Sequence, residues 1–132
     1  MRNYRYFICY SLIVVFSIVV LVGCKSEQNE APKTIEAYIK ALSEQDANQV
    51  SSLSCSEWER SALTEVDSFT AVSAEIKNLT CEQTGQDGDT ILVSCTGIIA
   101  LDYNGEAQQI DLSSRTYIAR KEGGEWRMCG YR

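Results

Sequence analysis

The 132-residue chain contains no histidine, and its six cysteines include no C-x-x-C pair. Histidine is the most frequent general base in enzymes and, with cysteine, the usual ligand of zinc. Closely spaced cysteine pairs are typical of zinc sites and of thioredoxin-type redox motifs. The composition therefore removes the commonest catalytic base and the usual zinc and dithiol centres. We expect no metal site and no cofactor.

The first 23 residues also lack acidic side chains. Arg2 and Arg5 precede an apolar run over residues 7–22. This run is short for a membrane span, because a helix needs about 20 residues to cross the hydrocarbon core. A basic start followed by a short apolar run is typical of a secretory signal peptide.

The apolar run ends in Leu21, Val22, Gly23 and Cys24, without the A-x-A pattern of an ordinary signal peptide. This ending resembles the lipobox of bacterial lipoproteins. In that family the cysteine thiol receives a diacylglycerol, a signal peptidase cuts before it, and the new amino terminus is often acylated. The resemblance implies that residues 1–23 are removed and that Cys24 is the lipidated first residue of the mature chain.

An uncleaved anchor helix with an incidental cysteine is the alternative. One acyl chain binds a membrane only marginally, whereas two or three make a durable anchor. We therefore expect an exported protein tethered by lipid to the bacterial cell membrane. In a host with two membranes the outer one is favoured, because Lys25 stands where lipoproteins retained in the inner membrane carry aspartate.

The mature chain is acidic. Removing residues 1–23 leaves 10 basic and 18 acidic residues, a net charge of −8. Such a chain is repelled by phosphate backbones, so we expect no nucleic-acid partner. Residues 24–32 are mostly polar and predict a flexible tether, and residues 33–132 are enough for one small domain.

The first half of this domain has helical periodicity. Apolar residues recur at i, i+3, i+4 and i+7 in a helix predicted over residues 33–43. Two capping boxes, Asp46 with Gln49 and Ser56 with Glu59, predict the starts of two further helices. The residues expected to face the core from these three helices are Ile35, Tyr38, Ile39, Leu42, Val50, Leu53, Trp58, Ala62, Leu63 and Val66.

The second half alternates β-branched and aromatic residues with glycine turns, which indicates hairpins. Strands are predicted over residues 69–83, 90–103, 107–120 and 125–131. The turn at Asn104 and Gly105 sets Ile99 opposite Ile110 and Gly97 opposite Leu112. We expect an α+β fold in which N-terminal helices pack on one face of a curved antiparallel sheet of about four strands.

Four cysteines remain in the mature domain, and an even number in an exported chain predicts disulfides. A turn centred on Gly88 places Cys81 opposite Cys95, which leaves Cys55 to pair with Cys129. By loop length each bridge contributes about 3 to 4 kcal/mol.

The segment "IEAYIKALSEQDANQVSSL" and the ending "YIARKEGGEWRMCGY" carry a second resemblance. They resemble the nuclear-transport-factor-2-like superfamily, whose cystatin-like α+β roll forms a cone. Members open with a helix of the form seen at Tyr38, Ala41, Leu42 and Asp46. They close with a Gly-x-Trp hairpin like that of Gly124 and Trp126. The open end of the cone holds a substrate or a peptide in some members and nothing in others.

The resemblance does not settle function. Asp102 and Asp111 are the strand carboxylates that could point into the cone, although surface positions are favoured for both. The aromatic residues that could line a pocket, or simply fill the core, are Tyr38, Trp58, Phe69, Tyr117 and Trp126. We expect a non-catalytic binding domain for a small ligand or an envelope protein. A cone-fold isomerase or hydratase acting on a small hydrophobic molecule, or a homodimer joined through the open sheet, is the alternative.

These expectations predict the mass of the protein purified from its host. The chain should begin at Cys24, carry the mass of two or three acyl chains, and gain about 4 Da on reduction of two disulfides. Intact mass spectrometry with and without reductant measures this directly. A chain that keeps residues 1–23 would contradict the signal peptide, and free thiols would contradict the disulfides.

Overall fold

A computed structural model of the protein describes residues 30–132. The expected signal peptide, the lipidation site Cys24 and most of the expected tether lie outside these residues. Within the described part, no helix is both long enough and apolar enough to span a membrane. The domain has three helices and a five-stranded antiparallel sheet, so the predicted α+β class is confirmed and the sheet has one strand more than expected.

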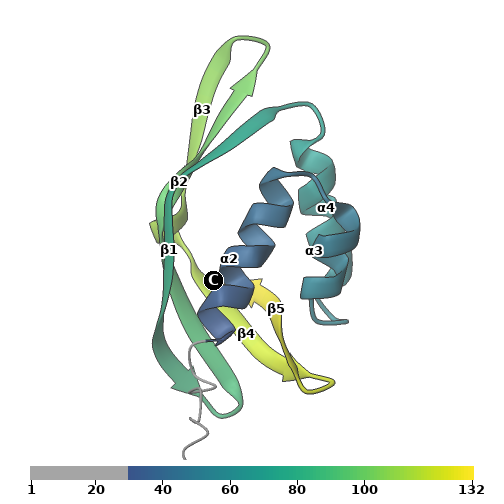
Figure 1. Ribbon diagram of the computed structural model, residues 1–132, viewed down its shortest axis with the longest axis vertical. Coiled ribbons are helices and arrows are strands. Elements are labelled where there is room, and N and C mark those ends of the chain that lie inside the picture. The colour runs from purple at the N-terminus through teal and green to yellow at the C-terminus, as the bar shows by residue number, and fades with distance from the viewer. Residues whose placement is uncertain (1–29) are drawn as a thin grey trace, which may run out of the picture.

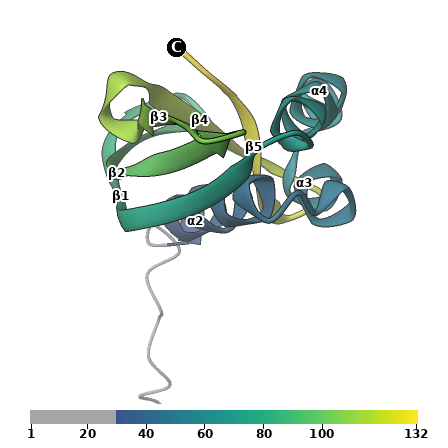
Figure 2. The ribbon, with the colours of Figure 1, turned by 90° about the horizontal axis from the view of Figure 1, so that it is seen from above.

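The first helix, α2 (Glu30–Ser43), lies along the concave face of the sheet (Figures 1 and 2). It begins three residues before the predicted start at Lys33, because Ala31 and Pro32 are buried and take part in its first turn. Proline is tolerated there because the first N–H groups of a helix have no partner within the helix. The last three residues of the expected tether are therefore helical.

The second helix, α3 (Ala47–Leu53), begins as predicted. The Asp46 side chain accepts a hydrogen bond from the Gln49 N–H over 3.0 Å, and Val50 is fully buried. The third helix, α4 (Glu59–Phe69), is capped by Trp58 without a side-chain hydrogen bond, so the second predicted capping box is wrong. Ser56 instead donates its N–H and hydroxyl to the carboxylate of Glu122, on the sheet.

The sheet is built around β2. The strands are β1 (Ser73–Asp87), β2 (Thr90–Tyr103), β3 (Glu106–Asp111), β4 (Thr116–Glu122) and β5 (Glu125–Tyr131). Their order is β1-β2-β4-β5, and β3 pairs with the second half of β2. Strand β1 begins four residues after the predicted start, because α4 continues to Phe69.

The predicted strand 107–120 is broken at Leu112–Ser114 by one 3₁₀ turn. The Asp111 carboxylate accepts hydrogen bonds from the Ser113 N–H and hydroxyl. These local hydrogen bonds take the place of hydrogen bonds to a neighbouring strand. Leu112 turns into the core and is 1% exposed. The predicted pair Ile99 and Ile110 is therefore confirmed, whereas Leu112 does not pair with Gly97.

Both cysteine pairs lie at disulfide distance, with Cα atoms 5.0 Å apart for Cys55 and Cys129 and 4.1 Å apart for Cys81 and Cys95. These are the pairs expected from the sequence. The β1–β2 turn is centred between Gly88 and Asp89 rather than on Gly88, and a bulge at Thr84 restores the register that sets Cys81 opposite Cys95.

A second irregularity, at Asn78 and Leu79, bends β1 and β2 around α2. Gly97 lies opposite it with φ +109°, and a Cβ there would approach the carbonyl oxygens of Lys77 and Asn78 to 2.6 and 2.7 Å. Only glycine fits this backbone without strain. Gly85, beside the other bulge, has no such constraint, since the nearest side-chain atom would lie 3.4 Å from its Cβ.

The two glycines predict unequal effects of the same substitution. Gly97→Ala should lower the free energy of unfolding by roughly 2 kcal/mol or more, because it adds a backbone clash to a positive φ. Gly85→Ala should change it by less than about 1 kcal/mol, because alanine fits this backbone without strain. Urea denaturation followed by circular dichroism measures both, and equal effects would contradict the proposed origin of the bend.

Candidate functional site

A cavity of about 220 Å³ lies inside the cone, between the C-terminal halves of α2 and α4 and the sheet. Its walls are mostly apolar, and its polar groups come from Glu65, Ser68, Arg115 and three tyrosines. The lining residues are Tyr38, Ile39, Leu42, Glu65, Ser68, Phe69, Ile99, Ile110, Leu112, Arg115, Tyr117 and Tyr131. An apolar space with a few convergent polar groups is the usual form of a small-molecule site.

Glu65 is the centre of the polar groups. Its Oε2 accepts a hydrogen bond of 2.6 Å from the Tyr38 hydroxyl, and its Oε1 accepts one of 2.7 Å from the Tyr131 hydroxyl. The guanidinium of Arg115 is 4.0 Å from Oε1. The side chain of Glu65 is only 18% exposed, so these partners replace most of the water that a carboxylate requires.

Aromatic packing holds this cluster in place. The Arg115 guanidinium lies 4.2 Å from the centre of the Tyr131 ring. Trp58 packs edge-on against Tyr131 and donates its indole N–H to the Tyr38 hydroxyl over 3.4 Å. The cluster therefore joins α2, α4, the start of β4 and the end of β5 at one point.

The tyrosines in the cavity are held neutral. Burial, followed by the hydrogen bond to Glu65 and its negative charge, raises the pKa of Tyr38 well above 10. Burial raises the pKa of Tyr117 to about 12, although the positive charge of Arg115 opposes the shift. Burial and the hydrogen bond to Glu65 also raise the pKa of Tyr131. At neutral pH these phenols act as hydrogen-bond donors rather than as bases.

The structure brings together only some of the aromatic residues singled out from the sequence. Tyr38, Phe69 and Tyr117 line the cavity. Trp58 stands behind Tyr38 as its hydrogen-bond donor and does not line the cavity. Trp126 lies elsewhere, because it follows the β4–β5 turn and lines a separate groove with Glu30 and Leu53.

Neither strand carboxylate points into the cavity. Asp102 is exposed and accepts a hydrogen bond from the Gly105 N–H in the β2–β3 turn. Asp111 caps the 3₁₀ turn, and its hydrogen bonds from Ser113 lower the pKa of its carboxyl. Both carboxylates stabilise local turns at the surface, in agreement with the prediction that favoured surface positions for them.

Sequence reasoning missed Glu65, Arg115 and Tyr131. A signal for Glu65 was present in the spacing of α4. Ala62, Val66 and Phe69 form its buried stripe, and Glu65 occupies the i+3 position of that stripe, where an apolar residue is usual. No comparable signal identifies Arg115, which reaches the site because the predicted strand breaks before it.

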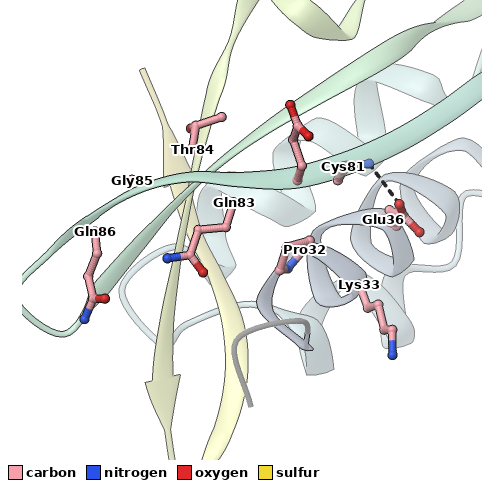
Figure 3. Close-up of a pocket in the computed structure, with 9 residues that line it drawn as sticks. Pro32, Lys33, Glu36, Cys81, Gln83, Thr84, Gly85 and Gln86 are labelled. Carbon is pink, nitrogen blue, oxygen red and sulfur yellow. Dashed lines mark hydrogen bonds between the residues drawn. The ribbon is translucent and has the colours of Figure 1, made fainter. Parts of the chain in front are cut away.

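A larger, open groove of about 810 Å³ runs between the first turns of α2 and the free edge of β1. Figure 3 shows Pro32, Lys33 and Glu36 on one side of it and residues of β1 on the other. The carboxylate of Glu36 accepts a hydrogen bond of 2.9 Å from the Cys81 N–H. This contact satisfies an edge N–H that has no neighbouring strand, which is a structural role.

Within residues 30–132, no three histidine, cysteine, aspartate or glutamate side chains form a group that could hold a metal ion.

Comparison with known proteins identifies the fold. No family profile matches the chain, and no curated protein sequence is similar to it. A nuclear-transport-factor-2-like protein from Streptomyces avermitilis, provisionally described as a dehydratase, is 16% identical. It superimposes with a TM-score of 0.55 over 80% of this chain and 93% of its own.

Two further solved structures agree. A nuclear-transport-factor-2-like protein of unknown function from Pseudomonas putida KT2440 is 14% identical, with a TM-score of 0.51 over 79% of this chain and 82% of its own. A nuclear-transport-factor-2-like protein with a cystatin-like fold from Novosphingobium aromaticivorans is 13% identical, with a TM-score of 0.52 over 92% of this chain and 82% of its own. The domain therefore has the nuclear-transport-factor-2-like, cystatin-like fold. Sequence identities this low support a shared fold and do not extend to function.

The buried tyrosines predict a loss of stability in alkali. A tyrosine whose folded pKa lies above its ordinary 10.0 stabilises the fold fully below pH 10 and loses that contribution as the pH rises toward its folded value, about 12 for Tyr117. The free energy of unfolding should fall above pH 10 by at most about 1.4 kcal/mol per pH unit for each such tyrosine.

Urea denaturation at a series of pH values measures this slope. Tyr38→Phe should make it shallower, because phenylalanine has no proton to lose. Tyr103→Phe is the control, since Tyr103 is 48% exposed on the β2–β3 hairpin. Equal slopes in both variants would show that Tyr38 ionises as freely in the folded protein as in the unfolded chain.

Proposed function

We propose that the protein is an exported, lipid-anchored domain that binds a small, mainly apolar molecule in its cone without transforming it. The lipid anchor is supported by the order of basic residues, apolar run and lipobox that ends at Cys24. The binding role is supported by the cavity and its polar cluster.

The cavity matches a compact ligand. Its volume of about 220 Å³ is below the range of about 300 to 1,000 Å³ usual for drug-sized ligands. Ile39, Ile99 and Ile110 offer apolar contacts, and Arg115 and Tyr117 offer polar ones. We therefore propose a ligand with a short apolar body and one hydrogen-bonding group.

The observation that carries a binding role is that both oxygens of Glu65 already accept hydrogen bonds from tyrosines within the fold. A general base must lie within hydrogen-bond reach of the proton that it removes and be oriented toward it. Glu65 is instead engaged in holding three elements together. Histidine, the commonest replacement, does not occur in the chain.

The runner-up is a small enzyme in which Glu65 moves a proton. A carboxylate beside tyrosines at the cone cavity is the arrangement that favours it, and the relative from Streptomyces avermitilis bears a provisional dehydratase description. In that case a substrate would displace one tyrosine from Glu65.

A direct test of binding uses nuclear magnetic resonance of isoleucine methyl groups. Titration with short aliphatic and aromatic acids and their amides should shift the methyl signals of Ile39, Ile99 and Ile110. Ile110→Trp should abolish these shifts by filling the cavity. Ile118→Trp is the matched control, because Ile118 lies between the buried Tyr117 and Ala119 and so faces the opposite side of the sheet.

Shifts of the same size in both tryptophan variants would place binding outside the cone, and no shift with any compound would overturn the binding role. Turnover of a bound compound by the native protein, lost in Glu65→Gln, would establish the enzyme instead.

A further inference from the structure

A second groove, separate from the cone cavity, surrounds Trp126. Its volume is about 410 Å³, and we call it the Trp126 groove. Trp126 itself is half-buried in β5, just after the Gly123–Gly124 turn. The lining residues are Glu30, Thr34, Leu53, Lys121, Gly124, Glu125, Trp126 and Arg127.

This groove lies where the described chain begins. Glu30, the first residue of α2, forms part of its wall. Six residue steps separate Glu30 from Cys24, and a fully extended chain of that length spans at most about 21 Å. A lipid on Cys24 would therefore keep Glu30, in the wall of the groove, within about 21 Å of the membrane surface.

The cavity lies toward the other end of the domain. It is lined by Tyr38, Ile39 and Leu42, which are in the second half of α2, and by residues from the last turns of α4. Figure 1 shows the start of α2 and the β4–β5 turn at one end of the molecule and the β2–β3 hairpin at the opposite end. The anchor and the cavity are thus separated along α2.

The chemistry of the groove suits a bilayer interface. Tryptophan concentrates at membrane–water boundaries, because its large ring is apolar and its N–H is polar. The Nζ of Lys121 lies 5.4 Å from the centre of the Trp126 ring. The charged lining residues cancel, since Glu30 and Glu125 balance Lys121 and Arg127, whereas the mature chain carries −8. Repulsion from anionic head groups is therefore weaker at this surface than the net charge of the mature chain implies.

We propose that the Trp126 groove rests on the membrane interface and that the cone cavity opens away from it, toward water. The inference rests on the lipid anchor proposed above. Its consequence is that a ligand enters the cavity from the aqueous phase rather than from the bilayer.

The chain contains two tryptophans, Trp58 near the cavity and Trp126 in the groove. Their fluorescence can therefore show which of the two sites lies closer to the membrane. The native lipidated protein is incorporated into phosphatidylcholine vesicles whose acyl chains carry bromine, which quenches tryptophan at short range. Trp58→Phe, which keeps only Trp126, should lose roughly half of its fluorescence, because an interfacial ring lies close to the acyl chains. Trp126→Phe, which keeps only Trp58, should lose almost none.

Trp58 packs on Tyr131, so Trp58→Phe is checked for folding by circular dichroism. The quenching of Trp126 can also be obtained by subtracting the quenching of Trp126→Phe from that of the native protein. This second measurement does not require the Trp58→Phe variant. Protein that carries lipid by intact mass and floats with the vesicles, but shows equal quenching of the two tryptophans, overturns the orientation and leaves the anchor intact. Protein without lipid on Cys24 overturns both.

Discussion

Burial of one face of α2 in the hollow of the sheet is the constraint on which the rest of the domain depends. Ile35, Tyr38 and Ile39 are each no more than 1% exposed, and a large apolar side chain of this kind contributes about 1.5 to 3 kcal/mol when it leaves water. A flat sheet could not surround a helix on this scale. The bulges in β1, with Gly97 opposite one of them, supply the bend that allows it.

The Glu65 cluster follows from the same geometry. A cavity with mostly apolar walls lies between the C-terminal half of α2, the end of α4 and the curved sheet. A carboxylate can be tolerated at that point because two phenols and a guanidinium surround it. The arrangement stabilises the open end of the cone and also presents polar groups to anything that enters. The residues that hold these elements together are therefore the same residues that face the cavity.

The domain has two ends with different chemistry. One end carries the start of α2, the Gly123–Gly124 turn and Trp126, and the other contains the cavity and the exposed Tyr103 hairpin. An anchor joined to the first end and a cavity toward the second would let the protein sample the aqueous compartment while attached to a membrane. The disulfide-distance pairs connect α3–α4 with β5 and β1 with β2, so they brace the structure between these ends.

Local patterns in the sequence determined most of the helices and strands and the Ile99–Ile110 register, because helical periodicity, Asp46 capping and glycine turns act over a few residues. The pairing of Cys81 with Cys95 also depends on the bulge at Thr84, which no local pattern indicated. Tertiary structure decided three other features: the early start of α2, the break at Leu112 and the contact of Ser56 with Glu122. Each depends on burial or on a partner far along the chain. The site illustrates the same division. Tyr38 and Tyr117 were recognisable as inward-facing aromatics. Glu65, Arg115 and Tyr131 become one cluster only when α4, β4 and β5 converge, because the energy of a buried charge depends on neighbours that local spacing does not specify.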